Sequence, residues 1–161
     1  MTAVASRMRL QTSTVRRNER RNEIERLVSA CDTAIARLAD EQASGIAAGT
    51  FAATGEALFW LYALSSRRRR SRLSPGLIWA RHQCVRGNVF TGFAVADGSD
   101  WQLTPGRSTH AAKSMHVWLP LDRIEMRRPA YKLTQDAKTY ERDVAGRPVL
   151  DVLRDALAHF Q

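Results

Sequence analysis

The residues best suited to chemistry in this chain lie together in the segment Arg81-His82-Gln83-Cys84-Val85-Arg86. On the helix predicted here, Arg81 lies three or four residues from apolar side chains in both directions, which places it in the apolar stripe. A guanidinium buried without a partner is costly, so Arg81 needs a carboxylate, a backbone carbonyl, a second subunit or a phosphate. The alternative is that it extends to solvent or pairs with an acid such as Glu56. His82, at the edge of the same stripe, can exchange a proton near neutral pH.

A second concentration of charge is the run Arg67-Arg68-Arg69-Arg70-Ser71-Arg72. Five arginines in six residues repel one another, which predicts an exposed connection. One interpretation is that these five arginines, together with Arg86, contact phosphates and bind a nucleic-acid backbone with little sequence specificity. The other interpretation is a solvated linker. No aromatic residue interrupts the run, so base stacking on a single strand is not indicated there.

Most catalytic and metal-binding signatures are missing from the sequence. There is no Gly-rich phosphate loop, no His-Glu-x-x-His and no nucleophile elbow. The four histidines, His82, His110, His116 and His159, are scattered, and the two cysteines, Cys31 and Cys84, have no metal or disulfide spacing. We therefore expect no metal and no cofactor, and the free cysteines favour a reducing, cytoplasmic location.

Composition and charge narrow the class of protein. The 161 residues are 44% apolar and 25% charged, which excludes a disordered or collagen-like chain and fits one domain. The longest apolar run, Ala57 to Leu64, is too short to cross a membrane. The net charge is +9, and 22 of the 25 cationic residues are arginines, which favours a polyanionic partner such as a nucleic acid. Codon usage in a GC-rich genome is the alternative origin of this excess.

The N-terminal half is predicted to be helical. Residues 1–15 are expected to form a flexible basic arm, and residues 16–42 a long amphipathic helix with one apolar stripe: Ile24, Leu27, Val28, Cys31, Ile35 and Leu38. Small residues between Ala43 and Thr54 predict a loop or weak helix, after which Thr54 caps a central helix. Ser74-Pro75 predicts the start of a third helix, which Gly87-Asn88 ends.

The pattern then becomes strand-like. Residues 89–95 and 101–104 predict an antiparallel hairpin, and residues 116–119 a third strand that Pro120 confines to an edge. Helical periodicity returns from Thr134 to Gly146 and again from Pro148. We therefore predict a mainly α protein with one domain over residues 16–161. Its parts are a helical core (16–88), a small β-hairpin region inserted after the third helix (89–121) and a C-terminal helical pair (130–161).

The segment Arg81-His82-Gln83-Cys84-Val85 resembles the first five positions of the HEPN superfamily signature, in which an Arg and a polar residue precede three residues and a His. Gly76 to Ala80, Gly55 to Trp60 and Ala145 to Val149 are also similar to parts of small bacterial HEPN-like proteins. The resemblance covers the helical parts of residues 20–90 and the C-terminal tail, and it implies a helical bundle that forms a homodimer. It further implies that Arg81 and His82 are the catalytic residues of a metal-independent ribonuclease.

The sequence departs from that signature at its last position, where Arg86 stands in place of the His. In active members of the family the Arg stabilises the anionic transition state and the His moves protons while the 2′-hydroxyl attacks the phosphate. Arg86 can bind a phosphate, but a guanidinium cannot act as an acid or a base. The resemblance thus implies the fold and the dimer more strongly than the activity.

Three classes of function follow. The first is a HEPN-like RNA-binding or ribonuclease-type protein of a toxin–antitoxin or phage-defence system, with weak or lost cleavage and a cognate antitoxin or regulatory protein as a further partner. The second is a non-catalytic module that binds RNA or DNA, and the third is a protein–protein interaction module. Convergence of Arg81 and His82 from two subunits in one cleft favours the first class, whereas an isolated, buried Arg81 that pairs with an acid argues against it.

Overall fold

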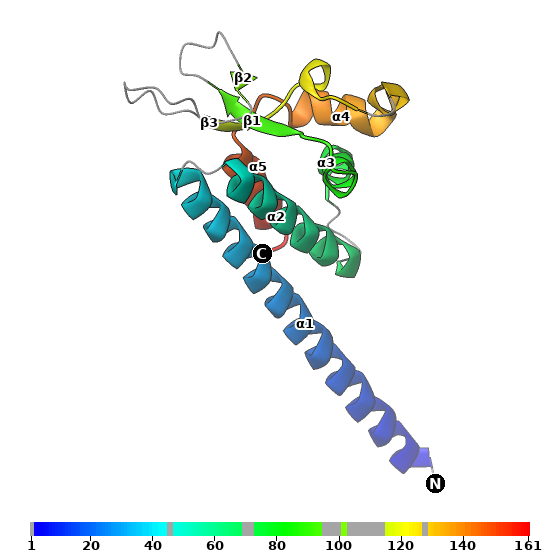
Figure 1. Ribbon diagram of the computed structural model, residues 1–161. Helices are drawn as coiled ribbons and strands as arrows, with labels where there is room; N and C mark the ends of the chain where they lie inside the picture. The colour runs from blue at the N-terminus through cyan, green and yellow to red at the C-terminus, as the bar shows by residue number, and fades with distance from the viewer. Residues whose placement is uncertain (1, 45–46, 69–72, 95–100, 103–114, 127–128) are drawn as a thin grey trace.

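The computed structural model describes residues 2–44, 47–68, 73–94, 101–102, 115–126 and 129–161. It is mainly helical, with a small antiparallel sheet after the third helix and two helices at the C-terminal end, as the sequence predicts (Figure 1). The elements in chain order are α1 (Thr2–Ser44), α2 (Ala47–Arg67), α3 (Pro75–Val85), β1 (Thr91–Ala94), β2 (Trp101–Gln102), β3 (Met115–Trp118), η1 (Leu121–Arg123), η2 (Pro129–Leu133), α4 (Gln135–Asp143) and α5 (Val149–Ala158).

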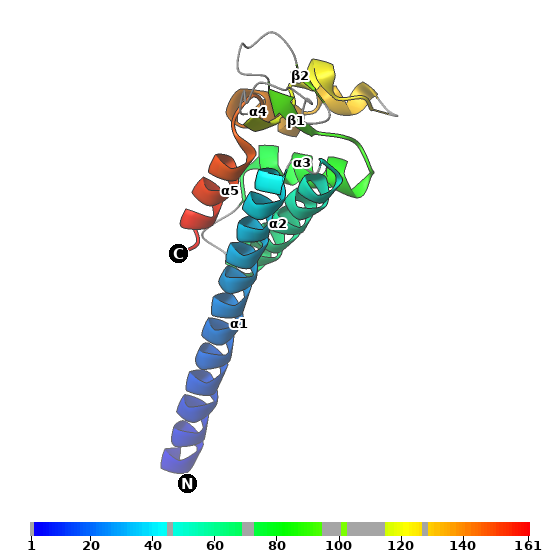
Figure 2. The same cartoon turned by 60° about the vertical axis from the view of Figure 1, so that its left-hand side comes forward.

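Helix α1 packs against α2 with the predicted apolar stripe. Cys31, Ile35 and Leu38 are buried, and Ile24, Leu27 and Val28 are half-buried at the margin of the core. The helix begins at Thr2, so residues 2–15, which we expected to form a flexible arm, continue it. No Pro or Gly interrupts this stretch, and α1 extends well beyond the other elements as one straight rod (Figures 1 and 2).

The predicted start of α2 at Thr54 is wrong. The helix begins at Ala47, and Thr54 lies inside it, buried, with its hydroxyl donating to the Thr50 carbonyl at 2.8 Å. Ala53 and Ala57 are also fully buried in this stretch. Burial of these small side chains against the core outweighs the weak helix propensity of the Gly and Thr residues that suggested a break.

The ends of α3 and α4 follow the predicted signals. Ser74 caps α3, because its side chain accepts a hydrogen bond from the Leu77 backbone N–H at 3.3 Å. Thr134 caps α4 in the same way. After α3 and α4 the chain turns at Gly87 and Gly146, whose φ angles of 72° and 76° are in the left-handed region that glycine tolerates best.

The sheet has the strand order β2-β1-β3, and both pairings are antiparallel. Phe93 of β1 lies opposite Gln102 of β2 and His116 of β3. The third strand is therefore an edge strand, as Pro120 indicates. The expected turn at residues 96–99 and the Pro105-Gly106 end of the second strand lie outside the described residues.

The core beneath α3 is aromatic and joins the sheet to α4. Tyr140 of α4 contacts the ring of Trp79 of α3 (centroids 4.6 Å apart) and lies edge-on to Trp118 of β3. The Tyr140 hydroxyl is buried and donates to the Leu119 carbonyl at 2.7 Å. These contacts fix one face of α3 against α4, while His82, Val85 and Arg86 are exposed.

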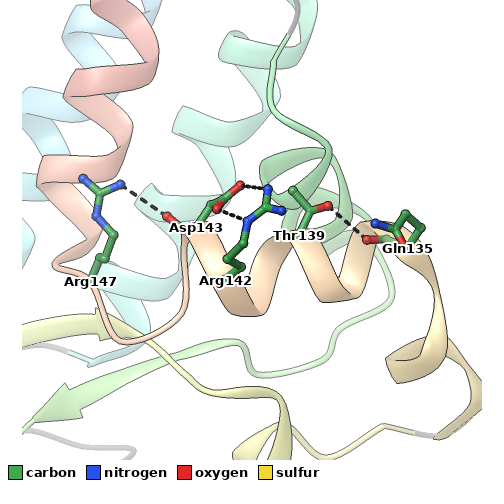
Figure 3. A network of polar contacts seen from close by, with 5 residues as sticks. All are labelled: Gln135, Thr139, Arg142, Asp143 and Arg147. Carbon is green, nitrogen blue, oxygen red and sulfur yellow. Dashed lines mark hydrogen bonds and ion pairs between the residues drawn. The ribbon is translucent and has the colours of Figure 1, made fainter.

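The turn between α4 and α5 holds a network of polar contacts (Figure 3). The Arg142 guanidinium donates two hydrogen bonds to the Asp143 carboxylate, at 2.6 and 2.7 Å, and Arg147 donates to the Asp143 carbonyl at 3.2 Å. The hydrogen bonds from Arg142 lower the pKa of Asp143. These two arginines are thus occupied by intramolecular contacts.

In the described part of the chain, no helix is both long and apolar enough to cross a membrane.

Candidate nucleic-acid interface

Helix α3 exposes the face that carries the predicted site. Its buried residues are Gly76, Leu77, Trp79, Ala80 and Gln83. Arg81 is half-buried at one edge of the exposed face, His82 and Arg86 are exposed, and Val85 is 73% exposed. We expected this apolar stripe to be a packing face within the chain, and the exposure of Val85 corrects that expectation. The reason is that α3 turns its Trp79 and Ala80 side into the core.

The Arg81 side chain contacts an aromatic ring of α2. Its guanidinium lies over the ring of Tyr62 of α2, 4.1 Å from the centroid, and its Nε is buried without a hydrogen-bond partner among the described residues. The alternative pairing with Glu56 is not formed, because Glu56 accepts a hydrogen bond from Arg37 at 2.9 Å. Stacking on Tyr62 stabilises the cation through the π-face, and since Nε is buried, the Nη groups are the N–H donors that could reach an anion.

Arg86, at the C-terminal end of α3, is held in a similar way. Its guanidinium lies over the ring of Tyr131 of η2, 4.5 Å from the centroid, and Nη1 donates a long hydrogen bond of 3.4 Å to the His82 carbonyl. No carboxylate in the described ranges forms an ion pair with Arg81 or Arg86. Among the described residues, these two guanidinium groups are therefore oriented by aromatic rings and have no carboxylate counterion.

His82 lies between these two arginines in sequence and one helical turn before Arg86. Desolvation of the ring lowers the pKa of His82, and the positive charges of Arg81 and Arg86 lower it further, against an opposing effect of Asp136. The imidazole is thus neutral at pH 7, so it can accept a proton and is a poor donor. His82 and Arg86 lie one helical turn apart on the exposed side of α3, whereas Arg81 lies about 140° around the helix from Arg86 and stacks on Tyr62 of α2.

The arginine run is only partly described. Arg67 ends α2 and forms an ion pair with Glu23 of α1, with 3.0 Å between Nε and Oε1. Arg68 follows it and lines an open groove beside α1. The predicted phosphate contacts Arg69, Arg70 and Arg72 lie outside the described residues. Arg67 is therefore engaged within the chain, and Arg68 remains available to a ligand.

The two tyrosines that orient the arginines were not predicted to belong to the site. Tyr62 follows Phe59 by three residues, so both lie on one side of an otherwise apolar helix, and both are exposed. The sequence signal that could have identified Tyr62 is a Tyr three residues after a Phe in an otherwise apolar helix. Nothing in the sequence indicates that Tyr131, 45 positions after Arg86, reaches that side chain.

No cluster that could hold a metal ion occurs among the described residues. His116 is buried in the sheet, and His110 lies outside the described ranges. Cys31 and Cys84 are both free thiols, and burial raises the pKa of each. The chemistry at this face is therefore that of guanidinium and imidazole groups.

Comparison with known proteins gives no relative: no protein-family model, curated protein or solved structure matches the chain.

Proposed function

We propose that the protein binds RNA through the exposed face of α3 and cleaves it slowly or not at all. The main supporting observation is that Arg81 and Arg86 each stack on a tyrosine ring and form no ion pair with a described carboxylate. The neutral His82 lies between them in sequence. Other arginines, such as Arg37, Arg142 and Arg147, form ion pairs with acids of the chain and are therefore less available to a phosphate.

Phosphate is the ligand that this arrangement fits. A guanidinium presents N–H groups in a planar fork that matches two phosphate oxygens, and the Tyr62 and Tyr131 rings restrict its orientation before binding. Preorganised donors lose less conformational entropy when they bind. The net charge of +9 adds a field that attracts any polyanion. RNA is preferred over DNA on the resemblance to the HEPN signature.

Slow cleavage follows from the side chains on the same face. When the 2′-hydroxyl attacks the adjacent phosphate, a base must take the hydroxyl proton and an acid must protonate the 5′-oxygen that leaves as the P–O bond breaks. His82 can serve as the base, because its lowered pKa keeps it neutral. Arg86 occupies the position of the proton-transferring His and cannot replace it, and positioned acid–base catalysis accounts for about 100- to 10,000-fold in rate.

A homodimer would bring two such faces together. Phe59 is 50% exposed beside Tyr62 on α2, and Val85 lies one helical turn from Arg81 on α3. These four residues form what we call the α2/α3 face. Exposed apolar side chains that surround a partly buried arginine are typical of an interface. We propose that a second copy covers the α2/α3 face and places its own Arg81 near the first.

The biological setting is proposed on the resemblance alone. A HEPN-like protein with a weakened site fits a toxin–antitoxin or phage-defence system, with a cognate antitoxin or regulatory protein as a partner. The free thiols of Cys31 and Cys84 fit a reducing compartment, so we propose a cytoplasmic location.

Binding and cleavage of a labelled RNA by the native protein, three single variants and one double variant test the proposal. The native protein should bind with strong salt dependence, and Arg81→Ala should bind about tenfold more weakly because one charge-assisted contact is lost. Arg154→Ala is the matched control and should bind as the native protein does, because it removes an exposed arginine of α5 that forms no ion pair with a described carboxylate.

The fourth protein, Arg86→His, restores the family pattern and should gain cleavage that Arg81→Ala abolishes in the double variant. Fast cleavage by the native protein that Arg81→Ala leaves unchanged would refute the site. Absence of binding at low salt would favour the protein–protein interaction class instead.

A further inference from the structure

A second surface, distant in sequence from α3, has the composition of a docking groove for another protein. An open groove of about 740 Å³ runs along α1 where the end of α5 and Arg68, just after α2, approach it. Its floor is apolar, made by Ile24 and Val28 of α1 and by Phe160. We call it the α1 groove.

The rim of the α1 groove is cationic. Arg17, Arg20 and Arg68 line it, and no described carboxylate forms an ion pair with any of these three. Arg21 also lines it but is occupied by Glu25, with 2.8 Å between Nε and Oε1. The uncompensated charge is therefore positive and lies at the end toward the N-terminus of α1, whereas Asp32 lies at the other end.

The shape of the groove follows the axis of α1. Arg17, Arg21, Ile24, Val28 and Asp32 are spaced by three or four residues, so they form one stripe along the helix. Fifteen residue steps of α-helix make this stripe about 22 Å long. A straight helical ridge with satisfied backbone groups offers no edge to a β-strand, and it accepts a second helix through packing of side-chain ridges into grooves. The part of α1 toward its N-terminus projects beyond the other elements (Figures 1 and 2). Arg17, Arg21 and Asp32 of the stripe are exposed, and Ile24 and Val28 are half-buried.

We propose that the α1 groove binds an acidic amphipathic helix of a partner protein. The apolar stripe of that helix would cover Ile24 and Val28, and its carboxylates would contact Arg17, Arg20 and Arg68. A second copy of this chain fits less well, because it would bring another arginine-rich surface against the rim. A phosphate backbone also fits less well, because it has no apolar groups that would pack against the floor of the groove. The proposal is independent of RNA binding at α3.

A designed probe tests this occupant. The probe is a fluorescein-labelled peptide of about 18 residues, or about 27 Å as a helix, with leucines in one stripe and glutamates elsewhere. A scrambled peptide of the same composition, without the stripe, has the same charge. The native protein should bind the amphipathic peptide at least about tenfold more tightly than the scrambled one, since only the former can place leucines on the floor.

The chain offers a matched pair of variants. Arg17 lines the groove, and Arg26, nine residues later, lies on the opposite side of α1 and is exposed. Both reversals, Arg17→Glu and Arg26→Glu, change the net charge equally. We expect Arg17→Glu to weaken the amphipathic peptide about tenfold and Arg26→Glu to leave it near the native affinity. Circular dichroism checks that both variants keep the native helix content.

Three results would overturn the proposal. They are equal affinity for the two peptides, no binding of either peptide, and equal effects of Arg17→Glu and Arg26→Glu. A labelled RNA is measured in parallel: if Arg17→Glu weakens RNA and Arg26→Glu does not, the α1 groove is a phosphate site and the protein partner is excluded. If Arg81→Ala loses RNA binding but binds the peptide as the native protein does, the two surfaces bind their ligands independently.

Discussion

The buried histidine of the sheet makes the stability of this protein sensitive to acid. His116 of β3 is 2% exposed, and its ring lies against that of Phe93, with centroids 5.1 Å apart. Its Nδ1 has no hydrogen-bond partner within the described ranges. Burial lowers the pKa of His116 from 6.5 to about 4, so the folded state resists protonation.

The lowered pKa of His116 in the folded state sets the sign and the size of the change in the free energy of unfolding. Between pH 6.5 and 4 the unfolded chain binds a proton at His116 that the folded chain does not, so the free energy of unfolding falls as the pH falls through this window. At about 1.4 kcal/mol per pH unit, the loss amounts to about 3 kcal/mol by pH 4. Above pH 6.5 the group has no effect, because it is neutral in both states.

Urea denaturation at pH 7, 6, 5 and 4 measures this loss directly. Carboxylates also titrate near the acid end, so the informative quantity is the difference between the native protein and His116→Phe, which keeps a ring beside Phe93. We expect the native protein to lose about 3 kcal/mol more than His116→Phe between pH 7 and pH 4. His159→Gln, which changes an exposed histidine just after α5, is the surface control. Equal losses in the native protein and His116→Phe would refute the reasoning.

Three further substitutions test the packing and the proposed dimer. Tyr140→Phe leaves the buried Leu119 carbonyl without its 2.7 Å donor and should lower the free energy of unfolding by about 1–3 kcal/mol in urea denaturation, and an unchanged midpoint would contradict this role. Ser74→Ala removes the cap of α3 and should cost about 1 kcal/mol by the same assay; Ser66→Ala, on the exposed side of α2, is its control. Val85→Glu should convert the dimer to a monomer in light scattering without lowering the melting temperature, since Val85 is 73% exposed, and a native protein that is already monomeric would disprove the dimer.

The sequence predicted the elements well wherever local chemistry decides them. Ser74 and Thr134 cap helices because their hydroxyls satisfy free backbone N–H groups, and Gly87 permits the left-handed turn that ends α3. The stripe from Ile24 to Leu38 faces the core because its period matches the α-helix. Each of these signals acts within a few residues and is readable without a fold.

The errors came from interactions between distant segments. Thr54 has the chemistry of a cap, but burial beside Ala53 and Ala57 makes it part of the helix interior. At α3, several positions flanking Arg81 are apolar in sequence, and only the packing of Trp79 on Tyr140 reveals which face is buried. The ring that holds Arg81 belongs to α2, so no local spacing could predict that Tyr62 contacts it.

The most direct test of the central claim is an NMR titration of the protein with a short single-stranded RNA, followed through the side-chain Nε–H signals of its arginines. Arg81 Nε is buried without a hydrogen bond within the described part of the chain, so contact between the guanidinium and a phosphate should shift its signal strongly. The account predicts that the signals of Arg81 and Arg86 and the ring signals of His82 move together, while that of Arg154 stays in place. Shifts confined to the arginines of α1, with Arg81 and Arg86 unmoved, would contradict it.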